Sequence, residues 1–189
     1  TGEKEWAFTE PTDWLCSSPT VVDGTVYVGS QDEKLYAVDA ATGEKEWAFT
    51  EPTDWVNSSP TVMDGTVYVG SQDNTLYAVD AATGEKEWAF TEPRDSAESS
   101  PTVVDGTVYV GSQDTTLYAV NAETGEKEWA FHEPMAGVDS SPTVVDGTVY
   151  VGSMDTRLYA VDAETGEKEW AFTEPTDWLC SSPTVVDGT

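Results

Sequence analysis

The sequence predicts an all-β protein assembled from repeated four-stranded antiparallel sheets, and three observations support this prediction. A block beginning Ser-Ser-Pro-Thr-Val recurs with a spacing of 41 residues, at Ser17, Ser58, Ser99, Ser140 and Ser181. Each complete block places an Asp-Gly pair between two runs rich in Val and Tyr, which is the strongest short-range hairpin signal. A period of about 40 residues rich in strands is typical of β-propeller blades. We therefore predict a β-propeller.

The first complete block shows how each element follows from its residues. We expect strands at residues 19–22, 25–28, 35–38 and 44–49. Asp23-Gly24 joins the first two strands, because both positions of such a turn need a positive φ. Gly43 lies where a left-handed residue would close the turn before the fourth strand. Pro52 ends the block, because proline lacks a backbone N–H and restricts the residue before it.

The expected strands do not alternate between apolar and polar residues. Val26, Tyr27 and Val28 follow one another directly, and residues 35–38 form a second unbroken run. Continuous apolar runs of this length indicate a sheet that is covered on both faces. A propeller blade is such a sheet, because it lies between two neighbouring blades.

The repeat divides the chain into four blades and two partial ones. Residues 1–10 are expected to form the outer strand of a preceding blade, and residues 175–189 the inner strand of a following one. The complete blades are residues 11–51, 52–92, 93–133 and 134–174. Of the 41 repeat positions, 29 are identical in all four blades, and residues 165–189 copy residues 1–25 letter for letter. Repeats this similar indicate recent amplification, or a designed or consensus sequence.

The composition excludes several classes of function. The 36 acidic residues outnumber the 8 Lys and Arg, giving a net charge of −28. Nucleic-acid binding requires basic residues that neutralise phosphates, so no nucleic-acid partner is expected. The charge also disfavours anionic membrane surfaces. No apolar run approaches the roughly 18 residues of a membrane span, so no membrane insertion is expected.

The repeat resembles that of the pyrroloquinoline-quinone (PQQ) type β-propellers. The resemblance rests on the run V-Y-V-G-S-Q-D-x-x-L-Y-A-V-D-A-x-T-G-E-K-E-W, which begins at Val26. Its closing A-x-T-G-x-x-x-W is similar to the tryptophan-docking motif of that family, and it ends at Trp47, Trp88, Trp129 and Trp170. The resemblance implies that these tryptophans pack between adjacent blades. It also implies a soluble protein of the periplasm or cell exterior if the chain is natural.

Sequence differences between the blades point to one face of the ring. Eight of the twelve variable positions fall after each Glu-Pro or in the loop after Val-Gly-Ser, and both regions are expected on one face, here called the variable face. Loops on a rigid scaffold often carry binding residues. The candidates there are Trp14, Lys34, Trp55, Arg94, Met135 and Arg157. Loops also vary where nothing binds, so drift or design diversification is the favoured explanation of the pattern.

One repeat position, directly before Ser-Ser-Pro, is a candidate metal site. Asn57, Glu98 and Asp139 occupy it in three blades, and oxygen ligands of this type suit Ca²⁺. The resemblance implies calcium beside a quinone, held by Glu, Asn and Asp. However, one ligand per blade spreads the oxygens around a ring, and the adjacent Cys-Cys pair of the quinoprotein family is absent. We therefore expect no cofactor, with PQQ and calcium as the alternative.

Cys16 and Cys180 occupy the same repeat position at the two ends of the array. Their state is open: they could be free thiols, form a bridge between the chain ends, or cross-link two chains. His132 is the only histidine, which excludes a Ser-His-Asp triad and multi-histidine metal sites. It replaces a threonine of the other blades, so we interpret it as a surface substitution.

The sequence as a whole favours a non-enzymatic repeat scaffold or binding module, natural or engineered. Four blades carry apolar faces at both ends, so we expect self-association that closes a ring. The family implies rings of about eight blades. One alternative is a fragment of a PQQ- and calcium-dependent quinoprotein dehydrogenase. The other is an assembly or sensor domain that binds a protein on the variable face.

Overall fold

The computed structural model describes residues 2–186, and these residues form sixteen β-strands and no helix. The strands make four separate antiparallel sheets of four strands, each in sequential order. The first sheet contains β1 (Thr20–Val22), β2 (Thr25–Ser30), β3 (Lys34–Asp39) and β4 (Lys45–Phe49). The all-β prediction with four-stranded blades is confirmed.

The other three blades repeat this arrangement with nearly identical bounds. Their strands are β5 (Thr61–Met63), β6 (Thr66–Gly70), β7 (Leu76–Asp80), β8 (Lys86–Phe90), β9 (Thr102–Val104), β10 (Thr107–Gly111), β11 (Leu117–Asn121), β12 (Lys127–Phe131), β13 (Thr143–Val145), β14 (Thr148–Ser153), β15 (Arg157–Asp162) and β16 (Lys168–Phe172). The pairing between the third and fourth strands shifts register beside each docking tryptophan. In the first blade Ala37 pairs with Trp47, whereas the next residue, Val38, pairs with Lys45.

The hairpin turns have the backbone geometry that their residues predict. Asp23 and Gly24 have φ values of 50° and 87°, and Val22 pairs with Thr25 across the turn. Two successive positive φ values are the signature of a type I′ hairpin. The same geometry recurs at Asp64, Asp105 and Asp146. The fifth Asp-Gly pair, at Asp187, lies outside the described residues.

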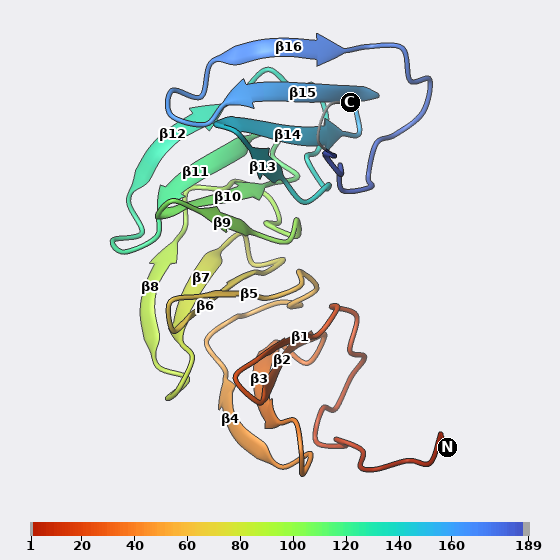
Figure 1. Cartoon of the computed structure of the whole chain (residues 1–189), viewed down its shortest axis with the longest axis vertical. Helices are drawn as coiled ribbons and strands as arrows, with labels where there is room; N and C mark the ends of the chain where they lie inside the picture. Colours follow the sequence, from red (N-terminus) through yellow and green to blue (C-terminus); the bar gives the residue numbers. More distant parts are fainter. Residues whose placement is uncertain (1, 187–189) are drawn as a thin grey trace.

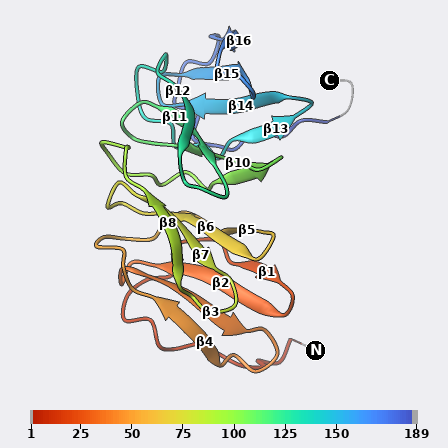
Figure 2. The same cartoon turned by 90° about the vertical axis from the view of Figure 1, so that its left-hand side faces the viewer.

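The four sheets stand side by side in a curved arc (Figure 1). The first strands β1, β5, β9 and β13 lie toward the concave side and contact one another in succession, while β4, β8 and β12 lie on the outside. A view turned by 90° places the first and last sheets at opposite ends of the long axis (Figure 2). The described residues therefore form an open arc of four propeller blades.

The core consists of the seams between blades rather than one central cluster. At the first seam Leu35 and Phe49 pack with Val67 and Val69 of the next blade, and all four are buried. Trp47 lies across this seam and donates its indole N–H to the carbonyl oxygen of Ala81 at 3.0 Å. The second and third seams repeat this packing. Both faces of the inner blades are covered, as the apolar runs predict.

The two partial blades differ from their predicted form. Residues 2–10 and 175–186 form no regular strand within the described chain, because the remaining strands of their blades do not lie beside them. Trp170 is predicted between blades, but it is 43% exposed, because the described residues contain no blade that follows it.

Within residues 2–186 there is also no helix with the length and apolarity that a membrane crossing needs.

Candidate functional site

The structure brings the two groups of variable residues together on one face. In each blade the link after Glu-Pro is tied to the loop between the second and third strands by a backbone hydrogen bond. Gln31 N–H donates to the Trp14 carbonyl at 2.9 Å, and Gln72 N–H donates to the Trp55 carbonyl at 2.9 Å. The link therefore lies against the rigid blade, and its side chains project from a fixed base.

The candidate binding residues on this face are distributed over four blades. Trp14, Trp55 and Met135 are 74%, 41% and 68% exposed, and Arg94 is exposed as well. Lys34 forms an ion pair of 3.4 Å with Asp32 of its own loop. Arg157 donates to the hydroxyl of Tyr159 at 3.4 Å. These residues therefore offer separate contact points along the arc rather than one convergent site.

Three of the residues that directly precede Ser-Ser-Pro make side-chain hydrogen bonds to a neighbouring blade. The Asn57 amide donates to a Glu98 carboxylate oxygen at 3.0 Å. Asn57 also accepts a bond of 3.4 Å from Gln31, whereas Gln72 and Gln113 donate to Glu98 and Asp139. These glutamines were not among the predicted site residues, although Gln recurs at this loop position in three of the four blades.

Asn57, Glu98 and Asp139, here called the rim residues, do not fit a calcium ion. The second, third and fourth blades each contribute one oxygen-bearing side chain, whereas the first blade has Cys16 at this position. Hydrogen bonds from the glutamines already engage Asn57, Glu98 and Asp139. Burial raises the pKa of Asp139, with a further contribution from the nearby charge of Glu98. Among residues 2–186 no group of three or more His, Cys, Asp or Glu side chains is placed to hold a metal. Because Ca²⁺ takes six to eight oxygens, these three side chains do not by themselves complete the coordination of a calcium ion.

One hollow on the third blade brings together two substitutions that the other blades lack. It has a volume of about 410 Å³, and Arg94, Lys127 and His132 line it. The His132 ring nitrogen Nδ1 lies 3.2 Å from the Thr116 hydroxyl, and Lys127 pairs with Glu92. His132 is exposed, as expected, but its neighbourhood with Arg94 was not predicted. The sequence signal is that Arg94 and His132, which both stand where the first two blades have threonine, occur in the same blade.

A hydrogen bond at the base of this hollow recurs in every blade. Asp114 accepts a bond of 2.8 Å from the Tyr118 hydroxyl. Burial, followed by this bond, raises the pKa of Tyr118 to about 12. The same pair occurs as Tyr36 with Asp32, Tyr77 with Asp73 and Tyr159 with Asp155. The bond therefore fixes the loop to the third strand and belongs to the scaffold.

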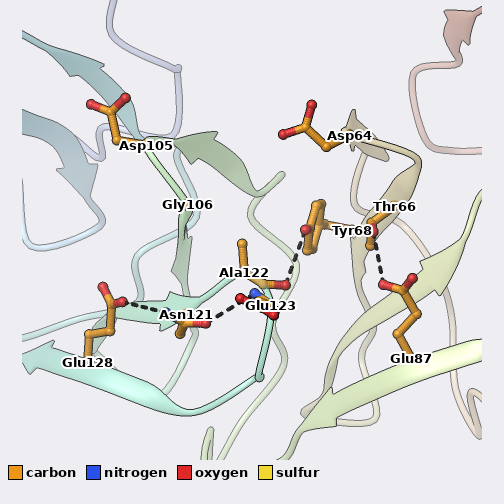
Figure 3. A pocket seen from close by; sticks show the side chains of 10 residues that line it. All are labelled: Asp64, Thr66, Tyr68, Glu87, Asp105, Gly106, Asn121, Ala122, Glu123 and Glu128. Carbon is orange, nitrogen blue, oxygen red and sulfur yellow. Dashed lines mark hydrogen bonds between the residues drawn. The ribbon is translucent and has the colours of Figure 1, made fainter.

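A further hollow lies on the opposite face, between the second and third blades (Figure 3). Its volume is about 620 Å³, and its lining includes the carboxylates of Asp64, Glu87, Asp105, Glu123 and Glu128. Tyr68 crosses the seam beneath it and donates to the Ala122 carbonyl at 3.3 Å. Thr66 and Asn121 hold Glu87 and Glu128 with bonds of 2.9 and 3.1 Å.

This acidic hollow is a property of the seam rather than a single site. An equivalent hollow of about 380 Å³ lies between the third and fourth blades and includes Asp105, Glu128, Asp162 and Glu164. Tyr109 repeats the bond of Tyr68, reaching the Ala163 carbonyl at 3.3 Å. The repeated carboxylates face solvent, which is the ordinary state of an acidic surface.

The two cysteines are free and exposed. Cys16 belongs to the first blade and Cys180 to the segment after the last blade. Figure 1 shows the first and last blades at opposite ends of the arc. A bridge between the two ends of one chain is therefore not formed, whereas a cross-link between chains stays a prediction.

Comparison with solved structures supports the propeller architecture. The quinohemoprotein alcohol dehydrogenase ADHIIG from Pseudomonas putida HK5 matches 88% of this chain and 35% of its own, with a TM-score of 0.77 and 24% identity. BamB from Moraxella catarrhalis matches 86% of this chain and 63% of its own, with a TM-score of 0.66 and 22% identity. The computationally designed Ika8 protein matches 86% of this chain and 50% of its own, with a TM-score of 0.79 and 16% identity.

The chain thus spans less than two thirds of each of these structures, and at such identities the likeness concerns the fold alone. No curated protein sequence matches the chain significantly. The family described as "Outer membrane protein assembly factor BamB" matches residues 1–130 and 94–189, which together span the whole sequence. With its PQQ-type blades and tryptophan docks, the chain belongs to this family of propeller repeats.

Proposed function

We propose that this chain is a non-enzymatic scaffold whose four blades are half of a ring that a second arc of the same kind closes. The open ends carry this proposal. At one end Trp170 and Phe172 are 43% and 45% exposed, whereas Trp47 and Phe49 at the first seam are 9% and 3% exposed. At the other end an apolar groove of about 280 Å³ includes Phe8, Leu15, Val26, Val28 and Val38.

The internal seams identify the partner that suits these ends. Each seam joins the face of one blade that carries a Trp and a Phe to the face of the next that carries a Val pair. The last blade exposes the first kind of face, and the first blade carries the second kind, on which Val26 is only half-buried. Head-to-tail contact between two arcs would therefore repeat a seam that the chain already makes three times. Two copies related by a two-fold axis are the commonest symmetric oligomer.

The expected size of the ring is eight blades. The arc matches half of the designed Ika8 chain, and its four blades would supply half of such a ring. The second arc would come from a second copy, or from further repeats of a longer chain. The ring would present the variable face on one side, where a protein partner could bind. A location in the periplasm or outside the cell is consistent with membership of this family.

Thiol cross-linking tests this proposal directly. In a head-to-tail ring, each junction places Cys180 of one copy at the repeat position that Cys16 of the other copy occupies. We expect a short bis-maleimide reagent to give a covalent dimer at micromolar protein concentration. Cys16→Ser and Cys180→Ser should each abolish the product, because the two remaining identical thiols lie at different junctions. A dimer that persists in either single variant would overturn head-to-tail closure.

The similarity to alcohol dehydrogenase ADHIIG favours one alternative function, a quinone-dependent enzyme. The test is incubation with PQQ and Ca²⁺, removal of free cofactor, and measurement of quinone absorbance and of dye reduction with an alcohol. We expect no stoichiometric retention, because Asn57, Glu98 and Asp139 are bound to neighbouring side chains. Retention of one PQQ per ring with turnover would overturn the scaffold proposal.

A further inference from the structure

The segment before the first blade occupies the dock of a missing neighbour. Trp6 donates its indole N–H to the Ala40 carbonyl at 3.0 Å, the same distance as in the bonds of Trp47, Trp88 and Trp129 across the three seams. A methyl group added to Gly43 would lie 2.7 Å from the Trp6 ring, and one added to Gly84 would lie 2.7 Å from the Trp47 ring. The tryptophan dock of the first blade is therefore filled.

Two further contacts of this segment repeat those of a true outer strand. The Phe8 and Tyr36 rings pack edge to face with centroids 5.2 Å apart, compared with 5.3 Å for Phe49 and Tyr77. Glu10 pairs with Lys45, as Glu51 does with Lys86. All these contacts form although residues 2–10 have no strand structure. Residues 2–10 therefore reproduce the side-chain contacts of β4 without its backbone pairing.

The segment after the last blade imitates a neighbour in the same way. Ser141 N–H donates to the Ser182 hydroxyl at 3.3 Å, and the Thr143 hydroxyl donates to the Pro183 carbonyl at 2.7 Å. Between the first two blades, Ser18 and Thr20 make the same bonds to Ser59 and Pro60, at 3.0 and 2.6 Å. Residues 181–183 thus stand where the first blade of a following arc would place residues 17–19.

Neither segment completes its seam, because each supplies one strand position instead of a whole blade. Val26 remains half-buried, whereas Val67, Val108 and Val149 at the same repeat position are fully buried. Leu158 and Tyr150 on the last blade are half-buried, whereas Leu35 and Tyr27 are 0% and 4% exposed. A hollow of about 220 Å³ remains beside Leu158, Phe172 and Leu179. The apolar surface that stays open at each end is therefore the surface that the middle strands of a neighbouring blade would cover.

We infer that both segments are placeholders, meaning that each occupies part of the contact surface of a neighbouring blade until that blade binds. Ring closure then proceeds when the segment before the first blade is replaced by the segment of identical sequence from a second copy. This inference rests on the proposed function and names its partner as a second copy of this chain. Trp170 of the second copy enters the dock at Ala40 and Gly43 and displaces Trp6. Residues 165–173 and 1–9 have the same sequence, so the dock keeps its contacts. The incoming blade adds Tyr150 and Leu158, which cover Val26 and Val28.

The energetics favour replacement at sufficient protein concentration. The contacts of Trp6 and Phe8 are exchanged for equal ones, so the net gain comes from the apolar surface of the two end blades. Exchange of an identical element between protomers is a low-cost route to a dimer. The placeholder also reduces the fraction of arcs that are ready to bind, which weakens the apparent affinity by that fraction.

A pair of matched tryptophan variants tests the inference. Trp6→Ala weakens only the placeholder, so the dimer dissociation constant should fall by about tenfold or more. Trp170→Ala removes the incoming side chain at both junctions, so the constant should rise on the order of 100-fold or more. The measurement is sedimentation equilibrium over a concentration series. Met63→Ala, on a side chain of the second blade that is 41% exposed, is the control and should change nothing.

The outcomes separate this inference from the proposed function. Opposite shifts for Trp6→Ala and Trp170→Ala support replacement. If both variants weaken the dimer, Trp6 belongs to the ring, and if neither changes it, the docks are not the junction; either result overturns the inference while self-association stands. If neither the wild type nor Trp6→Ala associates, both proposals are overturned. Trp170 is already 43% exposed in the arc, so its removal leaves the four blades folded, which circular dichroism verifies.

Discussion

Glycine serves two different purposes in this repeat, and two matched residues separate them. Gly65 has a φ of 86° with open space around its α-carbon, whereas Gly84 has a φ of 73° and lies against the Trp47 ring. Gly65→Ala should therefore cost only the left-handed backbone strain, about 1–2 kcal/mol. Gly84→Ala should cost about 1–3 kcal/mol more, because the methyl group also forces the tryptophan out of its dock. Urea unfolding measures both, and equal losses would contradict this account of the dock.

Asp80 holds the turn before the fourth strand of the second blade, and Asn121 does the same in the third. Asp80 accepts bonds of 2.8 and 2.7 Å from the hydroxyl and the backbone N–H of Thr83, and these bonds lower its pKa below the ordinary 3.8. Asn121 makes the equivalent bonds to Thr124 at 3.0 and 3.2 Å.

The two turns predict a difference in acid. A carboxylate with a depressed pKa stabilises the fold above its ordinary pKa, and this contribution is lost as the pH falls through the lowered value. The stability that Asp80 adds relative to Asp80→Asn should therefore be present near neutral pH and vanish in strong acid. Unfolding midpoints measured across the acid range check this, and a difference that grows as the pH falls would contradict it.

The seam between blades is the element that holds the fold, and its tryptophans differ sharply from those in the loops. Trp47 is 9% exposed and Trp14 is 74% exposed. Trp47→Ala should destabilise the protein by about 3–5 kcal/mol, because it removes a large buried side chain and leaves a cavity. Trp14→Ala should stay within about 0.5 kcal/mol of the wild type. Thermal or urea unfolding of the two variants checks this, and similar losses would show that the seam is not the core.

Strands and turns were predictable where adjacent residues determine the backbone conformation, and less predictable where the structure depends on residues far apart in the sequence. The Asp-Gly pairs and Gly43 set the turns, so all sixteen strands lie close to their predicted places. β2 and β3 extend to Ser30 and Lys34 because the ladder continues into the expected loop. The end segments lack strands, since backbone pairing depends on neighbours. Arg94 and His132 meet only through the fold, because 38 residues separate them.

At the scale of the whole molecule, charge opposes the association that the apolar ends favour. Each arc carries a net charge of −28, so two arcs repel each other. Salt screens this repulsion, since the Debye length falls from about 10 Å at 0.1 M to about 3 Å at 1 M. We expect the dimer dissociation constant to fall as NaCl rises over this range, as measured by sedimentation equilibrium. Weaker association at high salt would indicate that ion pairs, not apolar seams, form the junction.

The curvature of the arc, its exposed ends and its repeated seams together indicate that four blades are half of a closed ring. Electron microscopy of the purified chain, with particle mass determined on the same sample, tests it most directly. We expect closed rings of eight blades with the mass of two chains. A closed ring of four blades with the mass of one chain would contradict it.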